Sequence, residues 1–267
     1  MKLQSPKFIS PDRLTNIIYL GLLIVVFSAN NVFAQFEGSF KVEQYLYTQN
    51  GREQKEGTAD VFITPTRIRI NGLNGSKMPA QFGGLRTNSI LIRLDMKDFI
   101  IFGQNSEAVQ IKKSEIVNMM DMVGNLTGQM SGAKDDDVKN KRQIINTKEK
   151  KHIDGFPCHK IIVIDKEGKN VSKSVVWVTH KYAVNWGMLT EPWGDENSEI
   201  APFLSPSWLQ NGTMPIYAEM YDNGIKKSVL KVIDIRKKKV APRMMEIPSG
   251  MQLMSWRQLL LHNMFGR

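Results

Sequence analysis

The sequence contains one cysteine, Cys158, among its 267 residues. The chain therefore forms no internal disulfide, and its stability must come from packing. Cys158 leads into the apolar run 161–164, where a thiol is usually a small buried side chain. We interpret Cys158 as part of the core, with a reactive thiol as the alternative.

Local motifs of the common catalytic chemistries are also missing. The sequence has no Gly-x-Ser-x-Gly turn, no His-Glu-x-x-His pair and no phosphate-binding glycine loop. Its histidines and Cys158 lack the compact paired spacing of a metal site, and the acidic residues 135–137 lack the glycine and distal glutamate of a calcium loop. We therefore expect no catalytic residue, no bound metal and no cofactor, and predict that the protein is not an enzyme.

Long hydrophobic runs are absent except for the uncharged apolar segment 17–27. As a helix this segment rises only about 16 Å, against a hydrocarbon core of roughly 30 Å. Basic residues precede it, and Ala34 supplies the small residue at which signal peptidase cuts. We predict that residues 1–34 are a signal peptide cleaved after Ala34, so that the mature protein starts at Gln35 and is periplasmic or secreted. An uncleaved membrane anchor is the alternative.

Acidic residues are outnumbered by basic ones. The 26 Asp and Glu and 36 Lys and Arg give a net charge of +10, and removal of residues 1–34 leaves +8. The basic residues form short clusters, such as 112–113 and 237–239, which are typical of solvated strand ends. Attraction to an anionic membrane surface is the alternative. Because the chain is predicted to be exported, we expect no nucleic acid partner.

Apolar and polar residues alternate through most of the mature chain. At its start Phe36, Gly38, Phe40 and Val42 share one face, which predicts a half-buried strand. The short gaps between such segments favour antiparallel neighbours, and Asn223-Gly224 is a hairpin turn signal. Further strands are predicted at residues 59–63, 67–70, 89–94, 99–102, 108–112, 142–147, 159–164, 172–179, 213–221 and 227–236.

The pattern changes to a helical period after Lys113. Ser114 is suited to cap a helix, and Ile116, Met119, Met120 and Val123 follow at positions i, i+3, i+4 and i+7 of one face. Methionine is unbranched and polarizable, so this face can repack around apolar partners of different shape. We predict that these four residues bind an apolar ligand. Simple packing of the helix on the sheet is the alternative.

Three further segments lack the strand pattern. Residues 134–141 are predicted to be an exposed loop, and residues 182–208, rich in Trp and Pro, a cover of helix and loop. Ser255 is suited to cap a terminal helix. We expect one domain over residues 35–254, followed by a C-terminal helix or tail at 255–267.

Four short motifs occur in an order that resembles a known group of proteins. They lie at residues 153–160 (IDGFPCHK), 176–179 (VWVT), 214–216 (MPI) and 247–251 (IPSGM). The chain is similar in these motifs to an uncharacterised family of exported Gram-negative proteins whose fold is like that of the lipoprotein carriers LolA and LolB. The resemblance implies a mainly β, α+β domain: a curved antiparallel half-barrel with helices covering the concave face and an apolar cavity between sheet and helices.

Two functions follow from these observations. The first is a non-enzymatic periplasmic protein that binds a lipid, an acyl chain or another hydrophobic group in the cavity. The second is a structural or interaction protein of the cell envelope that docks on an anionic surface or on a protein partner. Uptake of an apolar probe favours the first, and a stable protein partner favours the second.

Overall fold

The computed structural model describes residues 35–48, 50–77, 86–103, 106–118, 141–167, 170–191 and 209–265. All of them belong to the second of the two units into which the chain divides, Gln35–Arg267. In these residues no helix has the length and hydropathy needed to cross a bilayer.

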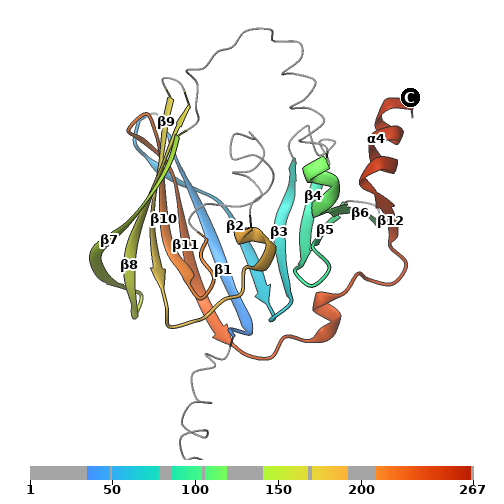
Figure 1. Ribbon diagram of the computed structural model, residues 1–267, viewed down its shortest axis with the longest axis horizontal. Helices are drawn as coiled ribbons and strands as arrows, with labels where there is room; N and C mark the ends of the chain where they lie inside the picture. Colours follow the sequence, from blue (N-terminus) through green and yellow to red (C-terminus); the bar gives the residue numbers. More distant parts are fainter. Residues whose placement is uncertain are drawn as a thin grey trace, which may run out of the picture. The chain divides into compact units, whose positions relative to one another are not determined.

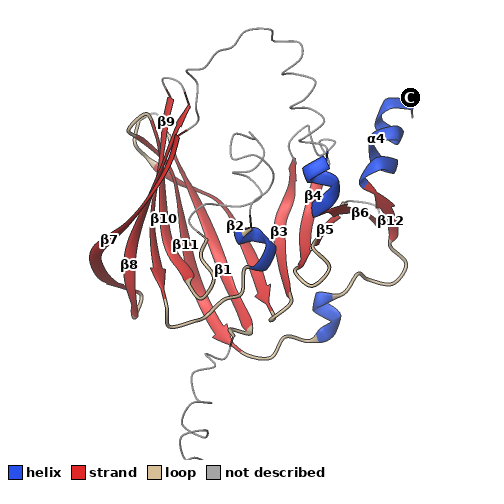
Figure 2. Ribbon diagram, in the orientation of Figure 1, coloured by secondary structure: helices blue, strands red, loops and turns tan. Residues whose placement is uncertain are grey.

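A single sheet of twelve strands forms the described unit (Figures 1 and 2), and its spatial order is β12-β6-β5-β4-β3-β2-β1-β11-β10-β9-β8-β7. Neighbouring strands are antiparallel throughout except for the parallel pair β12 and β6. The strands are β1 Gly38–Tyr47, β2 Glu53–Ile63, β3 Arg67–Lys77, β4 Arg86–Arg93, β5 Asp98–Phe102, β6 Glu107–Lys112, β7 Lys141–Ile153, β8 Phe156–Glu167, β9 Asn170–Thr179, β10 Met214–Asp222, β11 Ile225–Lys237 and β12 Gln252–Ser255.

The sheet consists of two antiparallel meanders, β1 to β6 and β7 to β11, joined where β1 pairs with β11. Two-residue turns connect several neighbours. At Asp154-Gly155 and Asn223-Gly224 both residues have positive φ, which gives the turn twist that matches antiparallel strands. The prediction of a large, curved, mainly antiparallel sheet is confirmed, and every predicted strand overlaps an observed one.

Each face of the sheet has its own core. The inner face, which is concave, carries Phe40, Val61, Ile68, Ile92 and Ile101, and their side chains form the larger cluster. The outer face carries a smaller cluster around Leu91 and Ile100. This division follows from the two-residue period of a strand, which sends alternate side chains to opposite faces.

The segment 240–251, which includes the short helix η4 (Pro242–Met245), packs on the outer face at β2 to β6. Arg67 Nη1 donates to the Met245 carbonyl oxygen at 2.6 Å, and Arg69 Nη1 donates to those of Met244 and Glu246 at 3.3 and 3.2 Å. The Arg69 guanidinium also lies over the Phe102 ring, 4.5 Å from its centroid. These arginines, which alternate with isoleucines in β3, thus hold the segment 240–251 against the outer face of the sheet.

The chain ends in the helix α4 (Trp256–Phe265), which follows β12 directly. The Ser255 side chain caps it as predicted: the Gln258 backbone N–H donates to Ser255 Oγ at 3.3 Å, and the Ser255 N–H donates to Gln258 Oε1 at 2.8 Å. This reciprocal pair is a capping box. Trp256 and Leu259 are each 3 % exposed and belong to the inner core.

Candidate functional site

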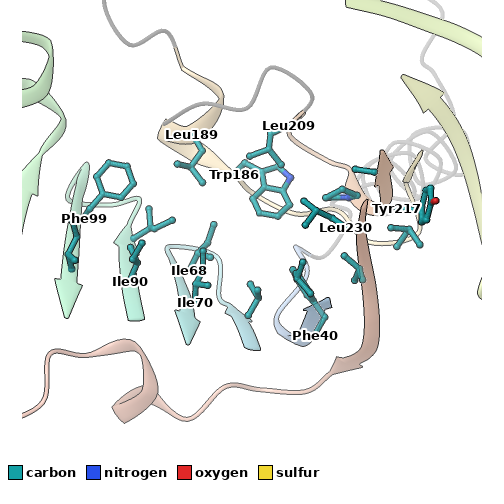
Figure 3. Close-up of a pocket in the computed structure, with 18 of the residues that line it drawn as sticks. Phe40, Ile68, Ile70, Ile90, Phe99, Trp186, Leu189, Leu209, Tyr217 and Leu230 are labelled. Carbon is teal, nitrogen blue, oxygen red and sulfur yellow. The ribbon is translucent and has the colours of Figure 1, made fainter. Parts of the chain in front are cut away.

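A cavity of about 340 Å³ lies against the inner face of the sheet. Its floor is made by side chains that project from successive strands, including Phe40 of β1, Ile68 and Ile70 of β3, Ile90 of β4 and Phe99 of β5 (Figure 3). Because residues two apart on a strand share a face, each of the strands β1 to β6 contributes one or two of these side chains. A row of β-branched and aromatic residues therefore becomes one continuous apolar surface.

The other side of the cavity is formed by Trp186, Leu189 and Leu209 (Figure 3). Trp186 and Leu189 belong to an irregular strap, residues 182–191, that contains the short helix η3 (Gly187–Thr190). The helical cover that the sequence predicts over residues 182–208 is described only as far as residue 191, and there it is a strap with one 3₁₀ turn.

Hydrogen bonds fix the strap at its polar groups while its apolar side chains face the cavity. Trp186 Nε1 donates to the Thr213 carbonyl oxygen at 2.9 Å, and the Trp186 backbone N–H donates to Asn211 Oδ1 at 2.8 Å. Gly187 has a φ of +49°, and a Cβ there would come within 3.0 Å of the Leu94 side chain. This position therefore favours glycine for both its backbone conformation and its close approach.

The predicted ligand-binding residues divide into two groups. Ile116, which is 1 % exposed, lines the cavity from a helix that begins at Lys113 and is described as far as Asn118. Met119, Met120 and Val123 lie outside the described residues, as do residues 134–140 of the predicted loop, whose last residue, Lys141, begins β7. Trp186 and Leu189 were not predicted as lining residues, because the strap has no regular period that would indicate which of its side chains face inward.

The described side chains that line the cavity carry no charge. Ala218 and Leu230 are paired, and both line the cavity. Tyr217 also lines it, and its hydroxyl donates to Glu219 Oε1 at 2.9 Å, while Glu219 pairs with Lys226 at 2.6 Å. Burial, and then this hydrogen bond, raise the pKa of Tyr217 to about 12. The cavity is thus a site for apolar contact.

The candidate thiol and metal residues lie elsewhere in the sheet. Cys158 is 3 % exposed, and burial raises its pKa to about 11, so the group is a thiol at neutral pH. The interpretation of Cys158 as core packing is confirmed. His159 and His180 stack with ring centroids 4.8 Å apart. Within the residues that the structure describes, no three His, Cys, Asp or Glu side chains come together as metal ligands.

No protein-family model matches the sequence. No curated protein matches it either. Among solved structures the chain is similar to PNGF-II in two crystal forms, with 10 % and 11 % identity, a TM-score of 0.40 in both, and coverage of 85 % of this chain. It spans about a third of the PNGF-II chains, 33 % and 34 %.

The chain is also similar to the LolA superfamily protein NE2245 from Nitrosomonas europaea. The identity is 11 % and the TM-score 0.32, and the match covers 80 % of this chain and 91 % of that one. Likenesses at these values do not assign a family. Membership of the exported family that the sequence resembles therefore stays a prediction.

Proposed function

We propose that the protein is an exported, non-enzymatic binding protein whose cavity holds an acyl chain or another elongated apolar group. The observation that carries this proposal is the uncharged lining of the 340 Å³ cavity. Its volume falls within the usual range for ligand pockets, roughly 300–1,000 Å³. Such a lining can bind a hydrocarbon, and the indole N–H of Trp186 and the hydroxyl of Tyr217 already donate to Thr213 and Glu219.

Apolar contact alone supplies enough free energy for useful affinity. Burial of about ten methylene groups at roughly 0.8 kcal/mol each gives on the order of 8 kcal/mol before association costs. A binding site of this kind needs no polar signature. This fits a sequence that lacks any motif of a reaction.

Titration with the fluorescent fatty acid cis-parinaric acid tests the proposal. Substitution Ile70→Phe fills part of the cavity with a larger side chain, so we expect it to lower the affinity for the probe at least about fivefold. The matched control is Ile162→Phe, since Ile162 is also half-buried but projects from the outer face of β8, where it pairs with Val175. We expect this control to bind the probe as the unsubstituted protein does.

The melting temperature of each variant is measured beside the titration, because an overpacked core can lose stability without any effect on a ligand. Two results contradict the proposal: no uptake of the probe by the unsubstituted protein, or equal affinities for both variants and the unsubstituted chain. Either result favours the second function, an envelope protein that docks on an anionic surface or a protein partner.

A further inference from the structure

Two lysines mark one end of the cavity. Phe99 of β5 and Ile111 of β6 are paired and both line the cavity, and Lys97 and Lys113 lie two residues beyond them at the same ends of the two strands. The Lys113 backbone N–H donates to the Lys97 carbonyl oxygen at 2.9 Å, which continues the ladder past the last strand pair. Lys97 lies in the turn before β5 and Lys113 is the first residue of the helix after β6, and the side chains of both reach Glu191, which ends the strap on the cavity side of the sheet.

Both lysines bind one carboxylate, that of Glu191 at the end of η3. Lys113 Nζ lies 2.8 Å from Glu191 Oε2, and Lys97 Nζ lies 3.2 Å from the same oxygen. Glu191 follows Leu189, which lines the cavity from the opposite side. The three charged groups therefore bridge the sheet and the strap, next to apolar residues that line the cavity from both sides.

Among the residues that the structure describes, two ammonium groups and one carboxylate form this bridge. The hydrogen bond from Lys113 is the main cause of a lowered Glu191 pKa; burial opposes it and Lys97 adds to it. Three acidic residues lie near the lysines in the chain. Asp95 lies 3.9 Å from Arg67, and Glu115 accepts from the Lys112 backbone N–H at 3.1 Å. Asp98 is bound by Arg93 and by Gln110 Nε2 at 2.7 Å, and by the strand period these three side chains face outward.

We propose that the ligand of the cavity is a single-chain amphiphile with an anionic head group, and that Lys113 and Lys97 bind this head group in place of the Glu191 carboxylate. The proposal rests on the proposed function and names the chemical class of its ligand. The hydrocarbon chain contacts Phe99, Ile111 and Ile116. The head group binds the two ammonium groups that hold the Glu191 carboxylate in the structure.

Binding of cis-parinaric acid is compared with binding of its methyl ester, which has the same chain and no charge. We expect the unsubstituted protein to prefer the acid. In Lys113→Met, which keeps most of the apolar stem, the preference should fall about threefold to fivefold, as for a partly exposed ion pair. Substitution of both lysines by Met should remove it, and Lys113→Arg should retain it.

Substitution Glu191→Gln gives the opposite change. It removes the carboxylate that competes with the head group, so the affinity for the acid should rise while that for the ester stays constant. The matched control is the pair Lys160→Met and Glu149→Gln, an ion pair of similar length between β8 and β7, which contribute no residue to the described lining, and it should leave both affinities unchanged. Displacement of the probe by hexadecanoate and by hexadecyl phosphate shows which anionic head group binds better.

The failure of this inference is distinguishable from failure of the proposed function. If acid and ester bind equally well to the unsubstituted protein and to Lys113→Met, the cavity binds the hydrocarbon chain but the lysines do not bind the head group. If Lys113→Met weakens acid and ester to the same extent, Lys113 only holds the strap in place, and the inference is again overturned. If neither probe binds, the proposed function is wrong and this inference falls with it.

Discussion

The indole Nε1 of Trp186 donates a hydrogen bond to the carbonyl oxygen of Thr213 at 2.9 Å, and both residues are buried. This bond joins the strap to the residue that precedes β10, and it lets a large aromatic ring line the cavity while its one polar atom is satisfied. The position of the strap over the sheet depends on it.

We expect Trp186→Phe to destabilise the protein by about 1–3 kcal/mol, because the buried Thr213 carbonyl loses its partner. Urea unfolding followed by circular dichroism measures this change. The control is Trp177→Phe, since Trp177 is only half-buried and its ring lies next to Lys151 and Lys160. Equal losses of unfolding free energy in the two variants would show that the hydrogen bond from Trp186 to Thr213 does not stabilise the protein.

The stability of the protein should fall as the pH decreases below about 6.5. Burial chiefly, then His180 and Lys150, lower the His159 pKa from its ordinary value of 6.5, so the unfolded chain binds the proton at a higher pH than the folded protein does. A group with this shift contributes stability above the unfolded pKa and loses it between the unfolded and the folded pKa.

Unfolding of His159→Gln and of the unsubstituted protein, compared between pH 7.5 and 5.5, tests this prediction. The variant should lose less stability over that interval. His152→Gln is the control, since His152 is exposed. The same pH dependence in all three proteins would assign the effect to other groups.

We expect Cys158→Ala to cost about 1–2 kcal/mol of stability, as for an ordinary core truncation, and to leave probe binding unchanged. The native thiol should also react slowly with a disulfide reagent at pH 8, because its raised pKa leaves little thiolate. Fast reaction of the native protein, or zinc bound in stoichiometric amount and lost in His159→Ala, would contradict this.

The exported form should start at Gln35, with no part of residues 1–34 attached. The short apolar run 17–27 and the small residue Ala34 motivate this prediction. Intact-mass measurement of the protein from the periplasmic fraction checks it. A chain that keeps Met1 and stays with membranes after a carbonate wash would identify the segment as an anchor.

The strands were predictable because their signals are local. The alternation around Phe40 and the Asn223-Gly224 turn each involve a few consecutive residues, and the structure has both. β12 was missed, since four residues are too few to show a period and their parallel partner β6 lies about 145 residues earlier. The hydrogen bonds from Arg67 and Arg69 to the segment 240–251 were not predicted for the same reason. A local pattern gives no information about a contact between residues about 175 positions apart.

The cavity was predictable only in part. Ile116 follows from the helical period after Ser114, and the inward residues of β1 to β6 follow from alternation. A local period indicates which side chains face the same way, but it does not show whether the space before them is filled. The contribution of Trp186 and Leu189 depends on hydrogen bonds to Thr213 and Asn211, which come from a different part of the chain.

The pairing of β1 with β11 sets the order in which the protein can fold. In this strand pair Val42 lies opposite Val232, which is about 190 residues later in the chain. Until β11 has been synthesised, β1 keeps an unpaired edge, and such an edge can associate with other chains. Because closing so long a loop is slow, we expect this strand pair to form late in folding. A chain truncated before β11 would lack the strand that joins the two meanders.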